Sequence, residues 1–167
     1  MEEVSIRESF DKFKPESCVF VISIDSNNQP NGMVAGLNMK CSIDPPFFAV
    51  SLSKNCNTQK LIRHSKEFVI AVPNMKLVKE VEFFGSTHGN EIDKFKETGI
   101  KTLPAKHIKP PLLKDATVNF ECKLEKQVTA GNHIVFIGRI LASYINKDEK
   151  VLFNFKKVDG KRVFKEL

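Results

Sequence analysis

The sequence predicts a mainly β protein, an antiparallel barrel of Greek-key type with two or three short flanking helices. Runs rich in Val, Ile and Phe recur along the chain, separated by Gly, Pro, Asn and Asp. These runs follow one another largely as hairpins, without the strand–helix–strand alternation of a parallel sheet. A closed barrel of about six or seven strands would remove exposed sheet edges.

Four strands are predicted in the first half of the chain, at residues 17–24, 32–35, 47–53 and 67–72. The first two form a hairpin around the polar turn 25–30. The segment Asp44-Pro45-Pro46 interrupts the chain, because proline fixes φ and restricts the residue before it. Each of these runs is apolar enough to contribute to one core.

Two helices are predicted between these strands and the irregular segment 85–115. Asn57 or Thr58 is expected to cap a helix over residues 59–64, because a short polar side chain accepts from the first free N–H groups. Asn74 is expected to cap a second helix. Its apolar positions share a face that is expected to join the core, namely Leu77, Val78, Val81 and Phe84.

The second half contains a long hairpin and a final short strand pair. Residues 116–129 and 133–146 form the hairpin around Ala130-Gly131-Asn132, and 151–155 pairs with 163–164. Segment 85–115 is too long and too rich in Gly and Pro for a simple connector, so we expect it to cover a site.

The composition indicates one globular domain spanning residues 1–167. The chain has a mass of 18.9 kDa, with 41% hydrophobic and 28% charged residues, which excludes a disordered protein. No apolar run is long enough to cross a membrane, and the first ten residues are acidic and polar, unlike a secretory signal. The four cysteines are widely separated and expected to be reduced. We therefore expect a cytoplasmic protein that does not interact with membranes.

The formal charge of +6 raises the alternative of a barrel that binds oligonucleotides. Basic residues gather in 101–114 and in the tail after Lys147, but neither segment interleaves aromatic with basic residues as an RNA-binding sheet does. A solvated lysine-rich surface is the simpler interpretation. We therefore expect no nucleic-acid partner.

Motifs for side-chain catalysis are missing from the sequence. It has no phosphate loop, no Gly-x-Gly-x-x-Gly turn, no Gly-x-Ser-x-Gly elbow and no metal-ligand spacing such as His-Glu-x-x-His. Glu91 and Asp93 lie two residues apart in a polar loop and are expected to be solvated. An apolar barrel with a helix N-terminus but no obvious acid, base or nucleophile suits a protein that holds a reactive cofactor.

Five segments, in order, resemble the flavin reductase-like family with an FMN-binding split barrel. They are residues 32–52, Asn55-Cys56-Asn57-Thr58 with the following helix, 67–73, the loop Gly85-Ser86-Thr87-His88-Gly89 with Asp93-Lys94-Phe95, and Gly131-Asn132-His133 with the strand to Gly138. The resemblance spans roughly residues 17–155. It implies a split antiparallel barrel that dimerises, with FMN near the subunit interface.

The resemblance also implies where FMN would lie. Its ring would lie against the strand 34–40 and its phosphate near residues 53–60, where a helix dipole favours an anion. Lys54 or Lys60 could add positive charge. The implied cofactor-binding residues are Gly36, Leu37, Asn38, Met39 and Lys40 along the strand, Ser53, Asn55, Asn57 and Thr58 near the phosphate, and Ser86 and His88 in the covering loop.

Other implied roles concern His133 and the pair Asp93-Lys94. His133 is the one catalytic candidate, since the family's hairpin position lies near the nicotinamide or the flavin. Fitting the turn that precedes its strand is the equally weighted alternative. Asp93 and Lys94 are expected to form a structural ion pair. The family's reductases tend to have small hydroxyl residues where this chain has Leu37, Met39 and Lys40. This difference favours a flavoredoxin-like or FMN-only branch over the FAD-using partners of monooxygenases.

The function predicted from these features is hydride transfer from NADH or NADPH to FMN. The alternative within redox chemistry is a flavoredoxin-type carrier that receives electrons from a protein partner and does not bind nicotinamide. In both cases the reactive atoms belong to the cofactor, and the protein binds and orients it.

Overall fold

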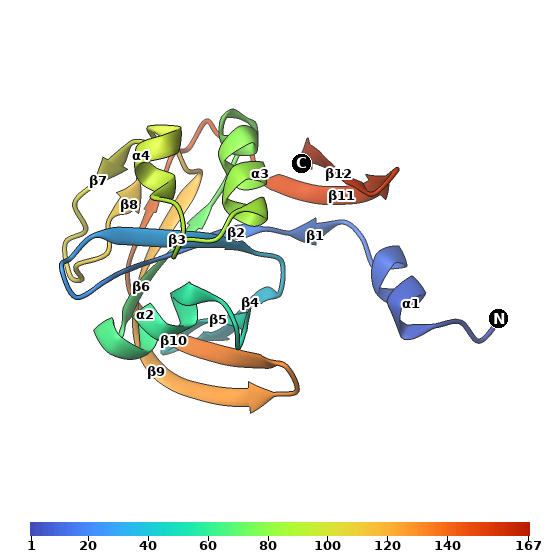
Figure 1. The fold of residues 1–167 in the computed structure, drawn as a ribbon, viewed down its shortest axis with the longest axis horizontal. Coiled ribbons are helices and arrows are strands. Elements are labelled where there is room, and N and C mark those ends of the chain that lie inside the picture. Colours follow the sequence, from blue (N-terminus) through green and yellow to red (C-terminus); the bar gives the residue numbers. More distant parts are fainter.

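The computed structural model describes residues 1–167 and is a mainly β structure built around an antiparallel seven-stranded sheet. The sheet order is β3-β2-β6-β9-β10-β5-β4. Its strands are β2 (Val19–Ile24), β3 (Pro30–Ala35), β4 (Asn38–Ile43), β5 (Pro46–Ser53), β6 (Glu67–Val72), β9 (Val118–Ala130) and β10 (His133–Ile145). Figure 1 shows this sheet curled into a barrel, with β2 and β3 facing β5 and β10. The predicted fold class is confirmed.

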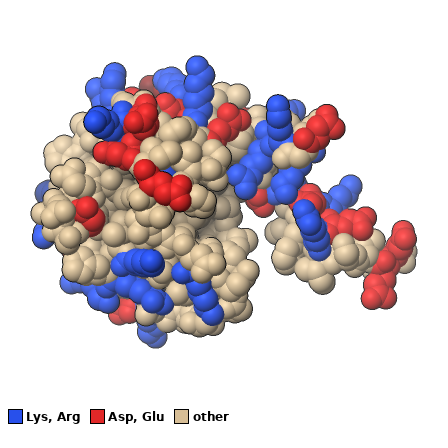
Figure 2. All heavy atoms as spheres, in the orientation of Figure 1, with Lys and Arg blue, Asp and Glu red and all other residues tan.

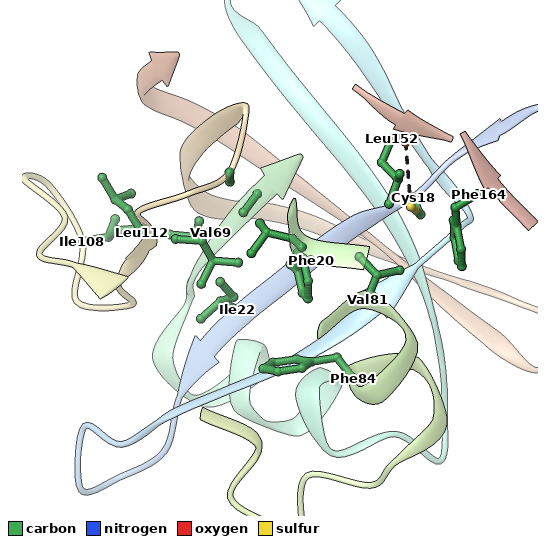
Figure 3. Close-up of a cluster of buried hydrophobic side chains, with 14 residues drawn as sticks. Cys18, Phe20, Ile22, Val69, Val81, Phe84, Ile108, Leu112, Leu152 and Phe164 are labelled. Atoms are coloured by element: carbon green, nitrogen blue, oxygen red, sulfur yellow. Dashed lines mark hydrogen bonds between the residues drawn. The ribbon is translucent and has the colours of Figure 1, made fainter. Parts of the chain in front are cut away.

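Both faces of the sheet are buried at β2 and β6, and the alternation along β2 explains how. Phe20 and Ile22 point into a cluster with α3 and β8, while Val19 and Val21 point into the barrel with Phe68 and other residues. Successive side chains of a strand face opposite sides, so a strand covered on both sides is apolar throughout. Figure 3 shows the first cluster, in which Phe20 meets the ring of Phe84 edge-on at 5.3 Å.

Helices α2 (Asn57–Ser65) and α3 (Val78–Ser86) cover the barrel, and both were predicted. Cys56 is the N-cap of α2 and makes no side-chain cap hydrogen bond, so the predicted cap at Asn57 or Thr58 is wrong by one or two residues. The Asn74 prediction is confirmed, because its side chain accepts from the Lys76 N–H. This cap starts the 3-10 turn η1 (Met75–Leu77), which runs into α3.

The irregular segment 85–115 contains the end of α3, helix α4 (Lys94–Thr98) and the small pair β7 (Thr102–Leu103) and β8 (Leu112–Leu113). The buried carboxylate of Glu121 on β9 holds part of this segment. It accepts the backbone N–H groups of Lys106 and His107 at 2.8 and 2.7 Å, and the Tyr144 hydroxyl at 2.6 Å. The segment is therefore packed on the barrel.

A second, three-stranded sheet joins the two ends of the chain. It contains β1 (Glu16–Ser17), β11 (Leu152–Val158) and β12 (Lys161–Glu166), in the order β1-β11-β12. The last two strands are longer than predicted. Before β1, helix α1 (Ile6–Lys12) projects from the body, as Figure 1 shows, and the sequence analysis missed it.

Strand β4 was also not predicted as separate from β3. It pairs with β5 and is the end strand of the seven-stranded sheet. The chain break assigned to Asp44-Pro45-Pro46 becomes the turn between β4 and β5. No helix of the structure has the length and apolarity needed to span a bilayer.

Candidate flavin site

A pocket of about 260 Å³ opens beside the N-terminus of α2. Its walls come from β3, the end of β5, the first turn of α2, the end of α3 and the loop that leads to α4. The polar residues that line it are Ser53, Asn55, Asn57, Thr58, Thr87, His88, Asn90 and Lys94. These elements are far apart in sequence, and the barrel brings them together.

The lining of this pocket contains a lysine and a histidine but no Asp or Glu. A neighbouring pocket, which shares Asn57, Gly89 and Asn90 with it, is lined by three acids, namely Asp25, Glu91 and Asp93. The two neighbouring pockets therefore form two halves of one surface that differ in charge. An anion is favoured in the acid-free half.

The N-terminus of α2 supplies backbone donors to this pocket. Cys56, the N-cap residue, makes no side-chain cap hydrogen bond, and the first turn contains no acid. No carboxylate or hydroxyl group of the cap therefore accepts the first N–H groups of the helix. The helix dipole also places partial positive charge there. Thr58, in the first turn, is only 2% exposed and lines the pocket.

Lys94 is the feature of the site that the sequence analysis misinterpreted. Its ammonium donates to the backbone carbonyl of Phe84 at 2.9 Å and lies over the Phe84 ring, 5.4 Å from the centroid. Asp93 instead caps α4 by accepting the N–H groups of Phe95 and Lys96. The predicted Asp93–Lys94 ion pair is therefore wrong: the sequence placed these residues together, but their side chains point to different partners.

Burial controls the ionisation of this region. Lys94 is 3% exposed, and loss of hydration lowers the pKa of its ammonium to about 8, against a small opposing effect of nearby Cys56. Burial also raises the pKa of the Cys56 thiol. The pocket therefore contains a neutral thiol and a lysine whose charge responds to its surroundings.

The covering loop is held against β3 by Asn31. Its side-chain amide donates to the Gly89 carbonyl at 2.6 Å, and the Asn31 amide group would overlap a side chain at position 89. Glycine therefore allows the loop to approach β3 closely. Asn31 does not line the pocket itself, and no sequence motif indicates its contact with the loop.

Five of the predicted cofactor-binding residues lie in this pocket: Ser53, Asn55, Asn57, Thr58 and His88. Ser86 does not line it, because its hydroxyl donates to carbonyls of its own helix, those of Glu82 and Phe83. Neighbouring Thr87 lies in the pocket instead. Neither Lys54 nor Lys60 is among the lining residues.

Of the predicted flavin strand, residues 34–40, Val34 lines the pocket, whereas Gly36 and the four residues after it lie outside its lining. Leu37 and Met39 on this strand are 58% and 60% exposed. Lys40 is also exposed. The side chain of Asn38 is occupied, because its amide donates to the carbonyls of Ser17, Ala35 and Gly36. Asn38 therefore shapes the turn between β3 and β4.

The two parts of the predicted site are connected along β5. The Ser51 N–H donates to the Leu37 carbonyl at 2.9 Å, and Ser53 lies two residues farther, at the pocket. Two strand residues span about 7 Å. The pocket and the start of β4 are thus consecutive parts of one surface.

His133 lies at the edge of this surface. It pairs with Ser53 across β10 and β5, and its Nδ1 lies 2.7 Å from the Asn132 side-chain oxygen. It is half-buried and does not line the pocket. The structure places no group of three or more His, Cys, Asp or Glu side chains in a position to hold a metal ion.

Comparison with known proteins agrees with this architecture. The family described as "Flavin reductase like domain" matches residues 15–161, which is most of the chain. This chain belongs to that family. The resemblance inferred from the five segments is confirmed.

Two curated relatives illustrate the range of sequence similarity. An uncharacterized protein of Pyrococcus abyssi is 32% identical over 130 residues, covering 78% of this chain and 74% of that protein. A ferric-chelate reductase (NAD(P)H) of Archaeoglobus fulgidus is 27% identical over 137 residues, covering 80% and 79%. The chain spans smaller parts of other archaeal relatives, 64% of one and 49% of another.

Among solved structures, the flavoredoxin of Desulfovibrio vulgaris has the same fold. It superposes with a TM-score of 0.84 at 24% identity and covers 99% of this chain and 93% of that one. This chain therefore shares the fold of a flavoredoxin.

Proposed function

We propose that this chain binds FMN and transfers a hydride to it from NADH or NADPH. The observation that carries the proposal is the acid-free pocket in which the α2 N-terminus and the buried Lys94 converge. A phosphate monoester carries between one and two negative charges near neutral pH and offers three acceptor oxygens. Backbone N–H groups, hydroxyls and an ammonium are the donors that such a group needs.

These residues fit the phosphate end of FMN. Thr58, Ser53 and Asn55 would donate to phosphate oxygens, and Lys94 would use donors that the Phe84 carbonyl leaves free. The phosphate would in turn stabilise the charged form of Lys94, which burial disfavours. A pocket without any acid avoids the repulsion that would exclude an anion.

The ring would lie along the surface that leads from Ser53 to β4. Gly36 has no side chain to keep a planar ligand from the backbone, although Oε1 of Glu16 lies 3.5 Å from where its Cβ would be. Lys40 would stabilise negative charge that develops on the reduced ring. His133 would orient a ligand at the Ser53 edge of this surface.

FMN, when bound, would supply the chemistry, since its ring accepts a hydride and passes electrons on singly or in pairs. The side chains of the pocket bind and orient it, and the segment 85–93 excludes water from one side. The name of the Archaeoglobus relative, which includes NAD(P)H, supports a nicotinamide donor. The transfer needs the two rings stacked about 3.5 Å apart.

We also propose a homodimer with the flavin near its interface. A volume of about 260 Å³ is below the roughly 300–1,000 Å³ typical of small-molecule sites, so a second copy would complete the binding pocket.

We also propose a reducing, cytoplasmic location, because all four cysteines are free thiols.

A carrier that receives electrons from a protein partner is the alternative function. The formal charge of +6 favours it, because a basic surface speeds association with an acidic redox protein. An oligonucleotide-binding barrel would also use that charge, and its affinity would fall steeply with salt.

FMN and riboflavin titrations of the purified protein test the cofactor proposal. We expect FMN to bind about 10–100-fold more tightly than riboflavin, which lacks the phosphate, because charge-assisted hydrogen bonds contribute about 1.5–3 kcal/mol each. Equal affinities would show that the pocket does not hold a phosphate. Salt-dependent binding of single strands by a colourless protein that takes up no FMN would replace the flavin proposal.

Anaerobic stopped-flow mixing then separates reductase from carrier. We expect NADH or NADPH to bleach the flavin band of the FMN-loaded protein at a rate of at least about 1 s⁻¹, the lower end of typical turnover. Absence of bleaching with either nucleotide, while dithionite still reduces the flavin, would support the carrier.

A further inference from the structure

The N-terminal arm, residues 1–13, has an apolar face that its own chain does not cover. Helix α1 begins after Ser5, whose hydroxyl accepts the Glu8 N–H at 3.2 Å, and no residue of the helix is buried. Ile6 and Phe10 are each 71% exposed, and Phe13 is 86% exposed. These three positions follow the spacing i, i+4, i+7, so they form one stripe along the helix.

An isolated helix of this length is not stable in water. Helices shorter than about 12–15 residues are marginal even with favourable sequences, and most gain their stability by packing an apolar face. The salt bridge between Asp11 and Lys157, at 3.4 Å, joins the arm to β11 through two exposed side chains. Figure 1 shows the arm directed away from the barrel. A surface outside this chain is therefore needed to cover the stripe.

Strand β4 offers a complementary apolar face on the same molecule. Leu37 and Met39, which share one face, are 58% and 60% exposed, and Ile43, which follows the bulge between Lys40 and Ser42 and faces the other side, is 93% exposed. They lie on and just before the end strand of the seven-stranded sheet, whose outer edge has no neighbouring strand. Unpaired edges with exposed apolar side chains favour association with another chain.

The root of the arm is tied to the start of β4. The Ser17 hydroxyl donates to the Asn38 side-chain oxygen at 3.0 Å, and the Asn38 amide donates back to the Ser17 carbonyl at 3.2 Å. In a two-fold dimer each contact occurs twice, with the roles of the copies exchanged. A two-fold contact near β4 therefore brings the arm of each copy to the β4 of the other.

Charge also favours a contact between the arm and a second copy. The arm, residues 1–13, contains four acidic and two basic side chains, a formal charge of −2, so the rest of the +6 chain carries +8. Figure 2 shows acidic side chains at the free end of the arm and basic ones over the lower part of the barrel.

We propose that the arm of one copy packs its stripe of Ile6, Phe10 and Phe13 on the β4 face of a second copy, and that the second arm does the same in return. This inference rests on the dimer of the proposed function and names the segment that forms it. Strand β5 pairs with β4 and ends at Ser53 in the pocket, so β4 lies beside the pocket. The partner's arm on β4 therefore closes the open side of the flavin site.

Photo-crosslinking tests which surfaces meet. Benzoylphenylalanine replaces Phe10 in the full chain, and isotope-labelled and unlabelled copies are mixed before irradiation. We expect crosslinked peptides to join position 10 of one copy to residues 37–43 of the other, with mixed-label pairs showing that two copies are involved. Crosslinks within one chain, or to another segment of the second copy, overturn the proposal.

Sedimentation of variants tests whether the stripe drives association. We expect the double variant Phe10→Asp/Phe13→Asp to raise the dimer dissociation constant at least tenfold. Lys12→Asp is the control, because it makes the same change in charge away from the stripe, and it should not weaken the dimer. A double variant that dimerises as tightly as the wild type contradicts the proposal.

FMN binding on the same samples separates this inference from the proposed function. A wild-type protein that binds FMN but sediments as a monomer overturns the arm contact and leaves the cofactor proposal intact. A dimer with the expected crosslink that binds no FMN supports the arm contact, and the cofactor proposal then fails alone.

Discussion

The ammonium of Lys94 donates to the carbonyl of Phe84 at 2.9 Å, which ties the start of α4 to the end of α3 across the candidate site. This bond aims a buried cation at the pocket while satisfying one of its three donors. It also places the charge over the face of the Phe84 ring, where the ring quadrupole attracts it. The same residue therefore holds the covering loop and attracts an anion.

Replacing Lys94 by Met should reduce FMN affinity by about 10–100-fold and leave riboflavin affinity nearly unchanged. The reason is that methionine keeps much of the apolar stem but removes a charge-assisted hydrogen bond to the phosphate, about 1.5–3 kcal/mol. Quenching of flavin fluorescence during titration measures both constants.

Lys96→Met serves as the matched control for this variant. Lys96 lies on the same short helix but is exposed and does not line the pocket. Its affinity for FMN should equal that of the wild type. A loss of riboflavin binding as large as the loss of FMN binding in the Lys94 variant would indicate a collapsed pocket and contradict the phosphate contact.

FMN binding should be accompanied by proton uptake near pH 8.5. Burial lowers the pKa of Lys94 to about 8 in the free protein, so part of the population is neutral there. A phosphate dianion favours the charged form and raises this pKa again. By linkage, affinity should fall as pH rises above about 8. Calorimetry in Tris and TAPS, whose ionisation enthalpies differ, measures the uptake, which Lys94→Met should abolish.

The sequence was sufficient for the barrel because its signals are local. The alternation of β2 and the turn Ala130-Gly131-Asn132 depend on neighbouring residues, and Gly131 has the positive φ of +56° that such a turn requires. The two-sided burial of the strands also follows from their apolar runs. Helix α1 was missed because its apolar stripe has no partner within this chain, and β4 because it follows β3 after a turn of two residues.

The candidate site was predicted in part from the sequence. The predictions that failed concern contacts between residues that lie far apart in the chain. The pocket gathers Thr58 and His88 as the motifs indicate, but the motifs could not show where Lys94 points, because its partner Phe84 lies ten residues away on another helix. The contact of Asn31 with Gly89 joins residues 58 positions apart. Neither contact has a periodic or local signal in the sequence.

Glu121→Gln should destabilise the fold by about 2–4 kcal/mol at pH 7. Both carboxylate oxygens of Glu121 accept hydrogen bonds. The amide of glutamine would instead point its own N–H groups at one of these donors and leave that donor without an acceptor. Burial alone would raise the pKa of Glu121, but the donors from Tyr144, Lys106 and His107 outweigh it and leave the pKa lowered. Urea unfolding measures the difference between the two proteins.

The effect of this substitution should depend on pH with a defined sign. A lowered pKa contributes stability that is fully present above the unfolded value, about 4.3 for glutamate, and is lost as pH falls through the lower folded value. The gap between wild type and variant should therefore be constant from pH 7 to 5 and shrink in more acidic solution. Glu125→Gln, exposed on the same strand, should show no such gap.

Gly138→Ala should destabilise the protein by about 1–3 kcal/mol, because β10 passes directly beneath the ring of Phe68. A side-chain carbon at position 138 would overlap Cζ of Phe68 and lie 2.8 Å from Cε1 and 2.9 Å from Cβ of Cys122. Both neighbours are fully buried, so neither can move away without disturbing the barrel core. For a chain of this size the melting temperature should fall by roughly 2–4 °C per kcal/mol.

A double-mutant cycle with Phe68→Leu checks the cause. Leucine is smaller than phenylalanine, so the double variant should be more stable than the sum of the two single effects by at least about 0.5 kcal/mol. Gly36→Ala is the control, since its nearest neighbour is 3.5 Å from the added carbon, and its stability should change by less than about 0.5 kcal/mol. Strict additivity of Gly138→Ala and Phe68→Leu would show that the two residues do not compete for the same space.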